Sequence, residues 1–123
     1  MWIEFNPNPA GRKVGDCAVR AIAAALDVDW EDAYEMLTRA GYWMCDMPSS
    51  DSVIGAVLRG AGYNRYAVDN SCPDCYTAEE FCHANPQGTF VLFTGGHVVT
   101  AIDGCLYDSW DSSRAPVIYY WTK

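Results

Sequence analysis

The stretch HVVTAIDGCLYDSW, residues His97 to Trp110, decides how the second half of the chain folds. Two strand-forming runs flank Asp103-Gly104, and Asp-Gly is among the strongest signals for a two-residue hairpin turn. With these two residues in the turn, the register of both strands is determined, because a slip by one residue would exchange the two faces of the sheet. The sequence therefore predicts an antiparallel hairpin whose side chains can be assigned to faces.

This register places a histidine and an acid on the same face of the hairpin. Side chains alternate along a strand, so His97 shares its face with Asp108 and Trp110. His97 and Asp108 are one diagonal step apart, where the backbones are separated by roughly 7–8 Å. An imidazole and a carboxylate can hydrogen-bond across that separation. We therefore expect a His97–Asp108 pair in which the carboxylate orients the ring, with Asp111 as the competing acid.

Helical periodicity dominates the first half of the chain, and strand-forming runs fill the last third. Asp16 and Asp29 are N-cap candidates, and Thr77 with Glu80 forms a capping box. We expect helices at 16–26, at 30–40 with a stop at Gly41, within 48–62 and at 77–84, strands at 64–68, 89–94, 97–102, 105–110 and 117–121, and an irregular arm at 1–13. The prediction is one α+β domain over residues 1–123, with N-terminal helices packed on a C-terminal antiparallel sheet.

Cys17 follows Gly-Asp at the expected start of the first helix. The positive end of a helix dipole favours a thiolate, and a nearby histidine can accept the thiol proton. A carboxylate behind the histidine fixes its tautomer and stabilises the imidazolium. Cys17, His97 and Asp108 are therefore the candidate nucleophile, base and orienting acid. The alternative is that Cys17 is a buried small apolar residue, His97 a structural histidine and Asp108 a turn acid.

The segments around these three residues resemble the papain-like cysteine peptidases. In that family the cysteine opens a long N-terminal helix, the histidine begins a strand in the C-terminal half, and the third residue often precedes Ser-Trp. Here VGDC, GGHVV and YDSWDS are similar, with Asp108 in place of the usual Asn. Nearly the whole chain also resembles small proteins encoded by bacteriophages and prophages of gut bacteria. The resemblance implies a papain-like fold and a peptidase or amidase with a Cys-His-Asp triad, a peptide or protein substrate and no cofactor.

The chain departs from the family pattern at the oxyanion hole. Papain carries a glutamine six residues before the nucleophile, and that position is Gly11 here. Asn6 or Asn8 is the expected substitute, acting as an amide donor beside the backbone N–H of Cys17. The missing glutamine and the short chain also motivate an alternative function. In that alternative the protein is a catalytically inactive papain-like binding protein that captures a host or phage partner.

The segment SCPDCYTAEEFCH offers a different chemistry. Cys72 and Cys75 have the spacing of half a zinc site, and Cys82 with His83 could complete four ligands. On a helix, however, Cys82 and His83 point about 100° apart. No second separated pair is present, so we expect no metal. Cys72 and Cys75 are then reduced thiols, the default for this chain, or a disulfide.

The charge balance narrows the partners. The net charge of −8 comes from 8 basic and 16 acidic residues, which argues against nucleic acid as a partner. No run approaches the roughly 18 apolar residues of a membrane span. The N-terminus also lacks the apolar region of a signal peptide. We therefore expect no membrane partner and a location in the host bacterial cytoplasm, with virion association as the alternative. These patterns indicate neither a particular substrate nor an oligomeric state.

Overall fold

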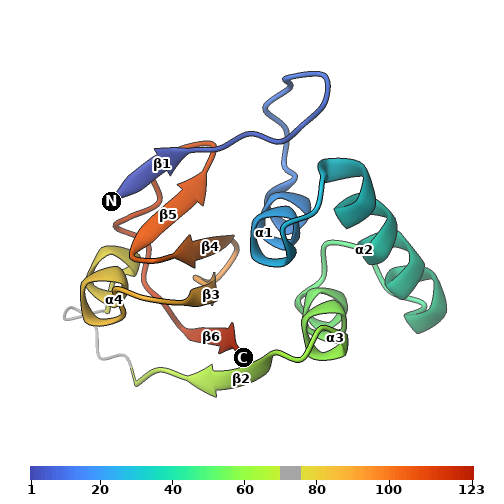
Figure 1. Ribbon diagram of the computed structural model, residues 1–123. Helices are drawn as coiled ribbons and strands as arrows, with labels where there is room; N and C mark the ends of the chain where they lie inside the picture. The colour runs from blue at the N-terminus through green and yellow to red at the C-terminus, as the bar shows by residue number, and fades with distance from the viewer. Residues whose placement is uncertain (70–75) are drawn as a thin grey trace.

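The computed structural model describes residues 1–69 and 76–123, which form an α+β fold around a six-stranded mixed sheet (Figure 1). The helices in these residues are α1 Cys17–Leu26, α2 Trp30–Met44, α3 Asp51–Gly60 and α4 Ala78–Ala84. The strands are β1 Trp2–Glu4, β2 Asn64–Ala67, β3 Thr89–Phe93, β4 Val98–Ile102, β5 Cys105–Asp108 and β6 Tyr119–Thr122. Their order across the sheet is β1-β5-β4-β3-β6-β2.

The predicted hairpin is confirmed. Strands β4 and β5 pair antiparallel with Thr100 opposite Tyr107. Asp103 and Gly104 have φ angles of 50° and 79°, and two positive values are what a type I′ turn requires. Glycine adopts this conformation without steric cost, and aspartate is one of the few other residues that tolerate it.

One prediction about the sheet was wrong. Within the expected arm of residues 1–13, Trp2–Glu4 forms β1, which pairs in parallel with β5. Because β1 lies at the edge of the sheet, it needs only one partner strand, and it ends before the prolines that follow. The sheet is therefore mixed, although its other four pairings are antiparallel.

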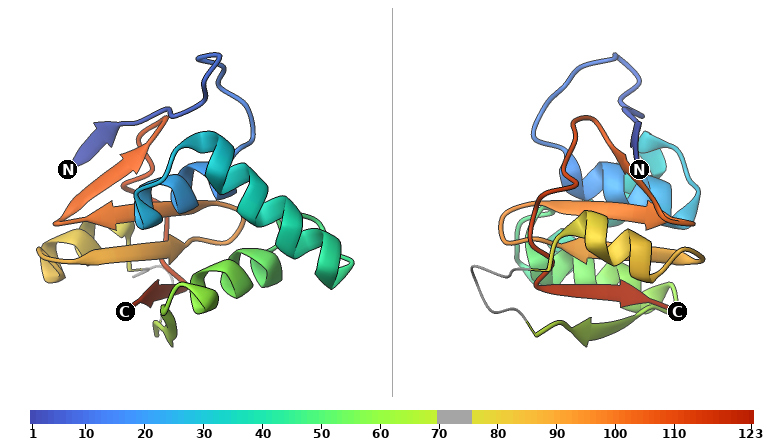
Figure 2. Two further views of the ribbon diagram at one scale, coloured as in Figure 1. Left: turned by 45° about the vertical axis from the view of Figure 1, so that its right-hand side comes forward. Right: turned by 90° about the vertical axis from the view of Figure 1, so that its left-hand side faces the viewer.

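Helices cover both faces of this sheet. Helices α1, α2 and α3 lie on one face and α4 on the other (Figure 2). Adjacent residues of β3 show the alternation: Val91 packs with the core under α1, and Leu92 packs with the core under α4. The Thr100 hydroxyl of β4 donates to the Ala21 carbonyl of α1 at 2.7 Å. This contact holds α1 on the sheet and so contributes to the position of Cys17 relative to the hairpin.

The predicted helices are present, but α2 is longer than expected. Gly41 was expected to end it, yet the helix continues to Met44. A Cβ at Gly41 would lie only 2.8 Å from the Asp46 carbonyl oxygen, so this glycine permits a close approach inside the helix. The capping box of Thr77 and Glu80 on α4 is confirmed.

A glycine of α3 gives a test of the packing. A Cβ at Gly55 would lie 2.9 Å from Trp121 Cζ2, whereas a Cβ at Gly60, in the same helix, would meet nothing within 4 Å. We expect Gly55→Ala to lower the free energy of unfolding by about 1–3 kcal/mol, the usual cost of overpacking a core. Gly60→Ala should be neutral or slightly stabilising because alanine favours a helix. Urea denaturation measures both, and equal losses would contradict this account of the contact.

Candidate active site

The hairpin brings His97 and Asp108 into contact at its open end, opposite the Asp103-Gly104 turn. His97 directly precedes β4 and Asp108 ends β5, and His97 Nε2 lies 2.7 Å from Asp108 Oδ2. Gly95 and Gly96, with φ angles of 75° and 103°, form the bend that leads into His97. The Asp108 side chain is fully buried. Because Asp108 occupies Nε2, the Nδ1 atom of His97 remains for proton exchange with a second group.

That second group is the thiol of Cys17, the half-buried first residue of α1. The thiol hydrogen-bonds with His97 and with the backbone N–H of Val98. Burial disfavours the thiolate, but these hydrogen bonds and the positive charges of His97 and Arg20 outweigh it and lower the pKa of Cys17. Burial also lowers the pKa of His97, but hydrogen bonds with Asp108 and Cys17 raise it to about 9 overall. The contact therefore favours a thiolate–imidazolium pair at neutral pH.

Arg20 is a site residue that the sequence analysis missed. Its side chain is almost fully buried, with Nη1 2.7 Å from Asp16 Oδ1 and both Nε and Nη2 3.0 Å from Asp108 Oδ1. One guanidinium thus bridges two buried carboxylates. A signal was present, because Arg20 is the one charged residue in the apolar run CAVRAIAAAL. A charged side chain on a buried helix face needs a buried partner.

The Asp108 carboxylate has further partners that hold it in place. Oδ2 accepts from the Ser112 hydroxyl at 2.6 Å, and Oδ1 accepts from the Ser109 N–H at 2.8 Å. Burial raises the pKa of Asp108, but hydrogen bonds with His97 and Ser112 and the nearby positive charges lower it overall. The competing acid, Asp111, is exposed and accepts from the Ser113 N–H instead. Asp108 is therefore the acid that faces the histidine.

The prediction that the Asp16 carboxylate caps α1 was wrong. Its Oδ1 accepts from Arg20, its Oδ2 accepts from the Trp30 indole N–H at 2.9 Å, and it makes no side-chain cap hydrogen bond. A buried guanidinium is a stronger partner for a carboxylate than a backbone amide. The first N–H groups of α1, including that of Cys17, are thus left without a side-chain cap. Such groups can bind an anion at a helix N-terminus.

A pocket of about 550 Å³ opens beside these residues. Its lining comes from the segment before α1, from α1 itself and from the ends of the hairpin: Lys13, Val14, Gly15, Cys17, Arg20, Gly96, His97, Ser109 and Trp110. The Trp110 ring lies 4.6 Å from the His97 ring, with 49% of the residue exposed. The indole therefore covers one side of the imidazole while the thiol remains open to the pocket.

The expected amide donors do not line this pocket. Asn6 Nδ2 donates to the Arg12 carbonyl at 3.2 Å, and Asn8 Oδ1 accepts from the Ala10 N–H at 2.9 Å, so both side chains shape their own loop. Asn8 lines a neighbouring pocket instead. Lys13 does line the pocket beside Cys17, and it forms no ion pair within residues 1–69 and 76–123. Among the residues that line the pocket, Lys13 and the backbone N–H of Cys17 are therefore the candidate donors to an oxyanion.

The alternative zinc ligands fall partly outside the described residues. Cys72 and Cys75 lie outside the described residues. The disulfide and the half zinc site considered for these two cysteines therefore lie outside them as well. Cys82 is buried in α4 while its neighbour His83 is exposed, so the two side chains point apart as predicted. In the described ranges, no three or more His, Cys, Asp or Glu side chains are grouped as a metal ion would need.

No protein-family model, curated protein or solved structure matches the chain. None of the helices in the described ranges is long and apolar enough to span a membrane. What the site can do chemically therefore follows from its own geometry. A thiol favoured as thiolate, an imidazole beside it and a buried carboxylate behind the imidazole, next to an open pocket, form a set suited to nucleophilic attack on a carbonyl carbon.

Proposed function

We propose that the chain is a papain-like thiol hydrolase, a peptidase or amidase that acts on a peptide or protein substrate. The observation that carries the proposal is the serial contact of the Cys17 thiol, the His97 imidazole and the buried Asp108 carboxylate beside an open pocket. The position of Cys17 at the first residue of a helix and of His97 at the start of a strand also supports it. Phage or prophage origin belongs to the same proposal on the sequence resemblance, and a cytoplasmic location belongs to it as an expectation from the sequence composition.

In this reaction the Cys17 thiolate attacks the substrate carbonyl carbon and forms a C–S bond, while the Cys17 N–H and Lys13 hold the oxyanion. The His97 imidazolium then donates its proton to the leaving nitrogen as the C–N bond breaks, which releases an amine and leaves a thioester. Neutral His97 next takes a proton from water, whose oxygen attacks the thioester carbonyl. The C–S bond breaks, the carboxylic acid leaves, and the thiolate–imidazolium pair is restored. Asp108 orients the ring throughout, and no cofactor takes part.

An activated ester tests the proposal without knowledge of the substrate. We expect p-nitrophenyl acetate to give a burst of p-nitrophenol equal to the enzyme concentration, with the acetyl group on the Cys17 peptide in mass spectrometry. Slower turnover should follow as water removes the acetyl group. Cys17→Ala should abolish the burst and the adduct. A wild-type protein that is not acetylated at Cys17 would contradict the proposal.

Lys13 has an expected role that a second reagent isolates. Lys13→Met should slow acetylation of Cys17 about tenfold, less than the loss of a rigid oxyanion donor costs because a lysine side chain is flexible. Alkylation by iodoacetamide forms no oxyanion and should keep its rate. Arg12→Met is the matched control, since Arg12 does not line the catalytic pocket. If Lys13→Met slows both reagents equally, Lys13 does not stabilise the oxyanion.

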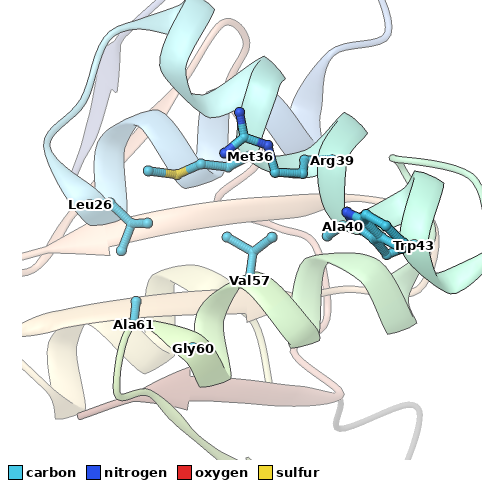
Figure 3. A pocket seen from close by; sticks show the side chains of 8 residues that line it. All are labelled: Leu26, Met36, Arg39, Ala40, Trp43, Val57, Gly60 and Ala61. Carbon is cyan, nitrogen blue, oxygen red and sulfur yellow. The ribbon is translucent and has the colours of Figure 1, made fainter.

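A separate groove favours the second candidate function, partner capture without catalysis. It holds about 380 Å³ between α2 and α3 and shares no lining residue with the catalytic pocket (Figure 3). Trp43 lines it, and both Trp43 and its neighbour Tyr42 are 77% exposed. Exposed aromatic side chains beside an apolar groove are typical of binding surfaces. The test is to express the protein in host cells and to measure the change in their growth. If Cys17→Ala retains that change and Trp43→Ala loses it, partner capture is favoured over hydrolysis.

A further inference from the structure

A further pocket, of about 350 Å³, lies between α3 and the edge of the sheet formed by β6 and β2. Within the described ranges it shares no lining residue with the catalytic pocket. Its volume is near the lower end of the roughly 300–1,000 Å³ that ligand pockets have, so it suits a small molecule. We call it the Arg59–Arg65 pocket. Its polar and aromatic lining residues are Asp51, Ser52, Arg59, Arg65, Tyr119 and Trp121.

The two arginines of this pocket have aromatic neighbours instead of acidic partners. In the part of the chain that the structure describes, neither Arg59 nor Arg65 forms an ion pair. The Arg59 Cζ atom lies 5.1 Å from the centre of the Trp121 ring, and the Arg65 Cζ atom lies 5.3 Å from the centre of the Tyr119 ring. Two such cations in one pocket are a concentration of positive charge in a chain with 8 basic and 16 acidic residues.

The indole N–H of Trp121 is an unused donor at the same place. Trp121 is 3% exposed, and its Nε1 has no hydrogen-bond partner among residues 1–69 and 76–123. The ring atoms nearest to a Cβ at Gly55 would be Cζ2, Cη2 and Cε2. Cε2 is bonded to Nε1, so the edge of the ring that carries the N–H faces Gly55, which also lines the pocket. A buried donor without a partner is costly, and an acceptor on a ligand would remove that cost.

The Arg59 side chain covers the Trp121 ring but is free to turn from it. Arg59 is exposed, and a cation–π contact at an exposed site is weak. A charge-assisted hydrogen bond between a guanidinium and an anion is stronger. An anion in the pocket can therefore draw the guanidinium off the ring, which also uncovers the indole edge beneath it.

The donors of this pocket fit a phosphate group better than a carboxylate. Two guanidinium groups, the Ser52 hydroxyl and the Trp121 N–H can donate more hydrogen bonds than the two oxygens of one carboxylate accept. A phosphate group offers three strong acceptor oxygens and a charge of about −1.5 to −2 at pH 7. Among the described residues Asp51 is the one acid in the lining, and its carboxylate hydrogen-bonds with Tyr119, so the lining keeps a net positive charge.

We propose that the Arg59–Arg65 pocket binds a phosphate group, either of free inorganic phosphate or of a small phosphomonoester. Arg59 and Arg65 pair with its oxygens, and the Ser52 hydroxyl and the Trp121 N–H donate to it. The site lies beside the first turn of α3, where the positive end of the helix dipole also favours an anion. It does not depend on the proposed hydrolase function, because none of these residues lines the catalytic pocket.

The indole N–H resonances of the five tryptophans, followed by ¹⁵N NMR, test this site. The protein is titrated with inorganic phosphate at constant ionic strength, and Trp121→Phe assigns the Trp121 resonance. We expect phosphate to shift this resonance with saturation. The resonances of Trp2 and Trp30 should stay in place, because these N–H groups already donate to Asp108 and Asp16. Acetate, which carries a single charge and two oxygens, should bind at least tenfold more weakly.

Variants then assign the binding to the pocket. Arg59→Met and Arg65→Met should each raise the dissociation constant for phosphate at least tenfold, because each removes charge-assisted hydrogen bonds. Arg114→Met is the matched control, since it removes the same charge from an exposed arginine outside the pocket. Asp51→Asn should tighten binding, because it removes the negative charge that opposes the phosphate.

Glycerol 3-phosphate distinguishes the two sources of the phosphate group. Competition with inorganic phosphate at equal or higher affinity would support a phosphomonoester as the ligand, and binding of inorganic phosphate alone would support free phosphate. The proposal is overturned if neither compound shifts the Trp121 resonance with saturation, or if acetate binds as tightly as phosphate does. It is also overturned if Arg59→Met and Arg65→Met change the dissociation constant no more than Arg114→Met does.

Discussion

Replacing Arg20 by methionine should lower the free energy of unfolding by about 3–5 kcal/mol, because removal of one partner leaves buried charges uncompensated. Methionine keeps much of the apolar stem of arginine but lacks the guanidinium that bridges Asp16 and Asp108. Both carboxylates lie in the buried part of the structure, so water cannot replace the lost partner. Urea denaturation at neutral pH measures the effect.

A second arginine provides the control for this prediction. Arg39 pairs with Glu35 on α2, but the side chains are 68% and 65% exposed. Exposed ion pairs contribute about 0–1 kcal/mol, so Arg39→Met should change stability very little. Equal losses in Arg20→Met and Arg39→Met would show that the buried network is not what stabilises this region.

The Arg20 effect should also depend on pH. The positive charge of Arg20 is one of the causes that lower the pKa of Asp108. A carboxyl group whose pKa is lowered in the folded state contributes stability above its unfolded pKa of about 3.9, and this stability is lost as the pH falls through the folded pKa. The difference in the free energy of unfolding between wild type and Arg20→Met should therefore become smaller as the pH is lowered from about 3.9 through the folded pKa of Asp108.

His97→Ala should reduce the turnover of p-nitrophenyl acetate by about 10²- to 10⁴-fold, the usual contribution of a general acid–base. The imidazole acts in both half-reactions, since it supports the thiolate during attack and activates water for removal of the acyl group. The variant should therefore form the acyl-enzyme slowly and hydrolyse it slowly. In the wild type, cleavage of an amide substrate should slow as the pH rises through about 9, because His97 then loses the proton that the leaving nitrogen needs.

The other histidine of the chain gives the matched control. His83 is exposed on α4, outside the catalytic pocket, and its replacement by alanine should leave turnover unchanged. Stopped-flow measurement of the burst and of the steady state separates the two half-reactions. If His97→Ala turns over as fast as His83→Ala does, the imidazole at position 97 has no part in the chemistry.

The contact between His97 and Asp108 could be predicted from the sequence because the Asp103-Gly104 turn allows one register. Within that register a diagonal pair on the same face follows from the geometry of a strand. The role of Cys17 as the candidate nucleophile was predicted from its residue type, from its place at the start of a helix and from the family resemblance. Its approach to His97 depends on how α1 docks against β4, and the local pattern does not encode that docking.

The Arg20 network and β1 could not be predicted in the same way. Arg20 meets Asp108 across 88 positions of sequence, and Trp2 pairs with Leu106 at the opposite end of the chain. Such long-range contacts override local preference, which assigned Asp16 to a helix cap and residues 1–13 to an irregular arm. The interpretation of Asn6 and Asn8 as pocket donors failed for a local reason, since both side chains satisfy backbone groups of their own loop.

The pH dependence of Cys17 alkylation tests the central claim, that the thiol and the His97 imidazole form an ion pair. Iodoacetamide rates from pH 5 to 10 should be followed on the Cys17 peptide by mass spectrometry, because the chain has six cysteines. In the wild type the inflection should lie below the ordinary thiol pKa of about 8.5, and in His97→Ala it should rise to that value or above, because burial then dominates. An inflection near the ordinary value in both proteins would contradict the account.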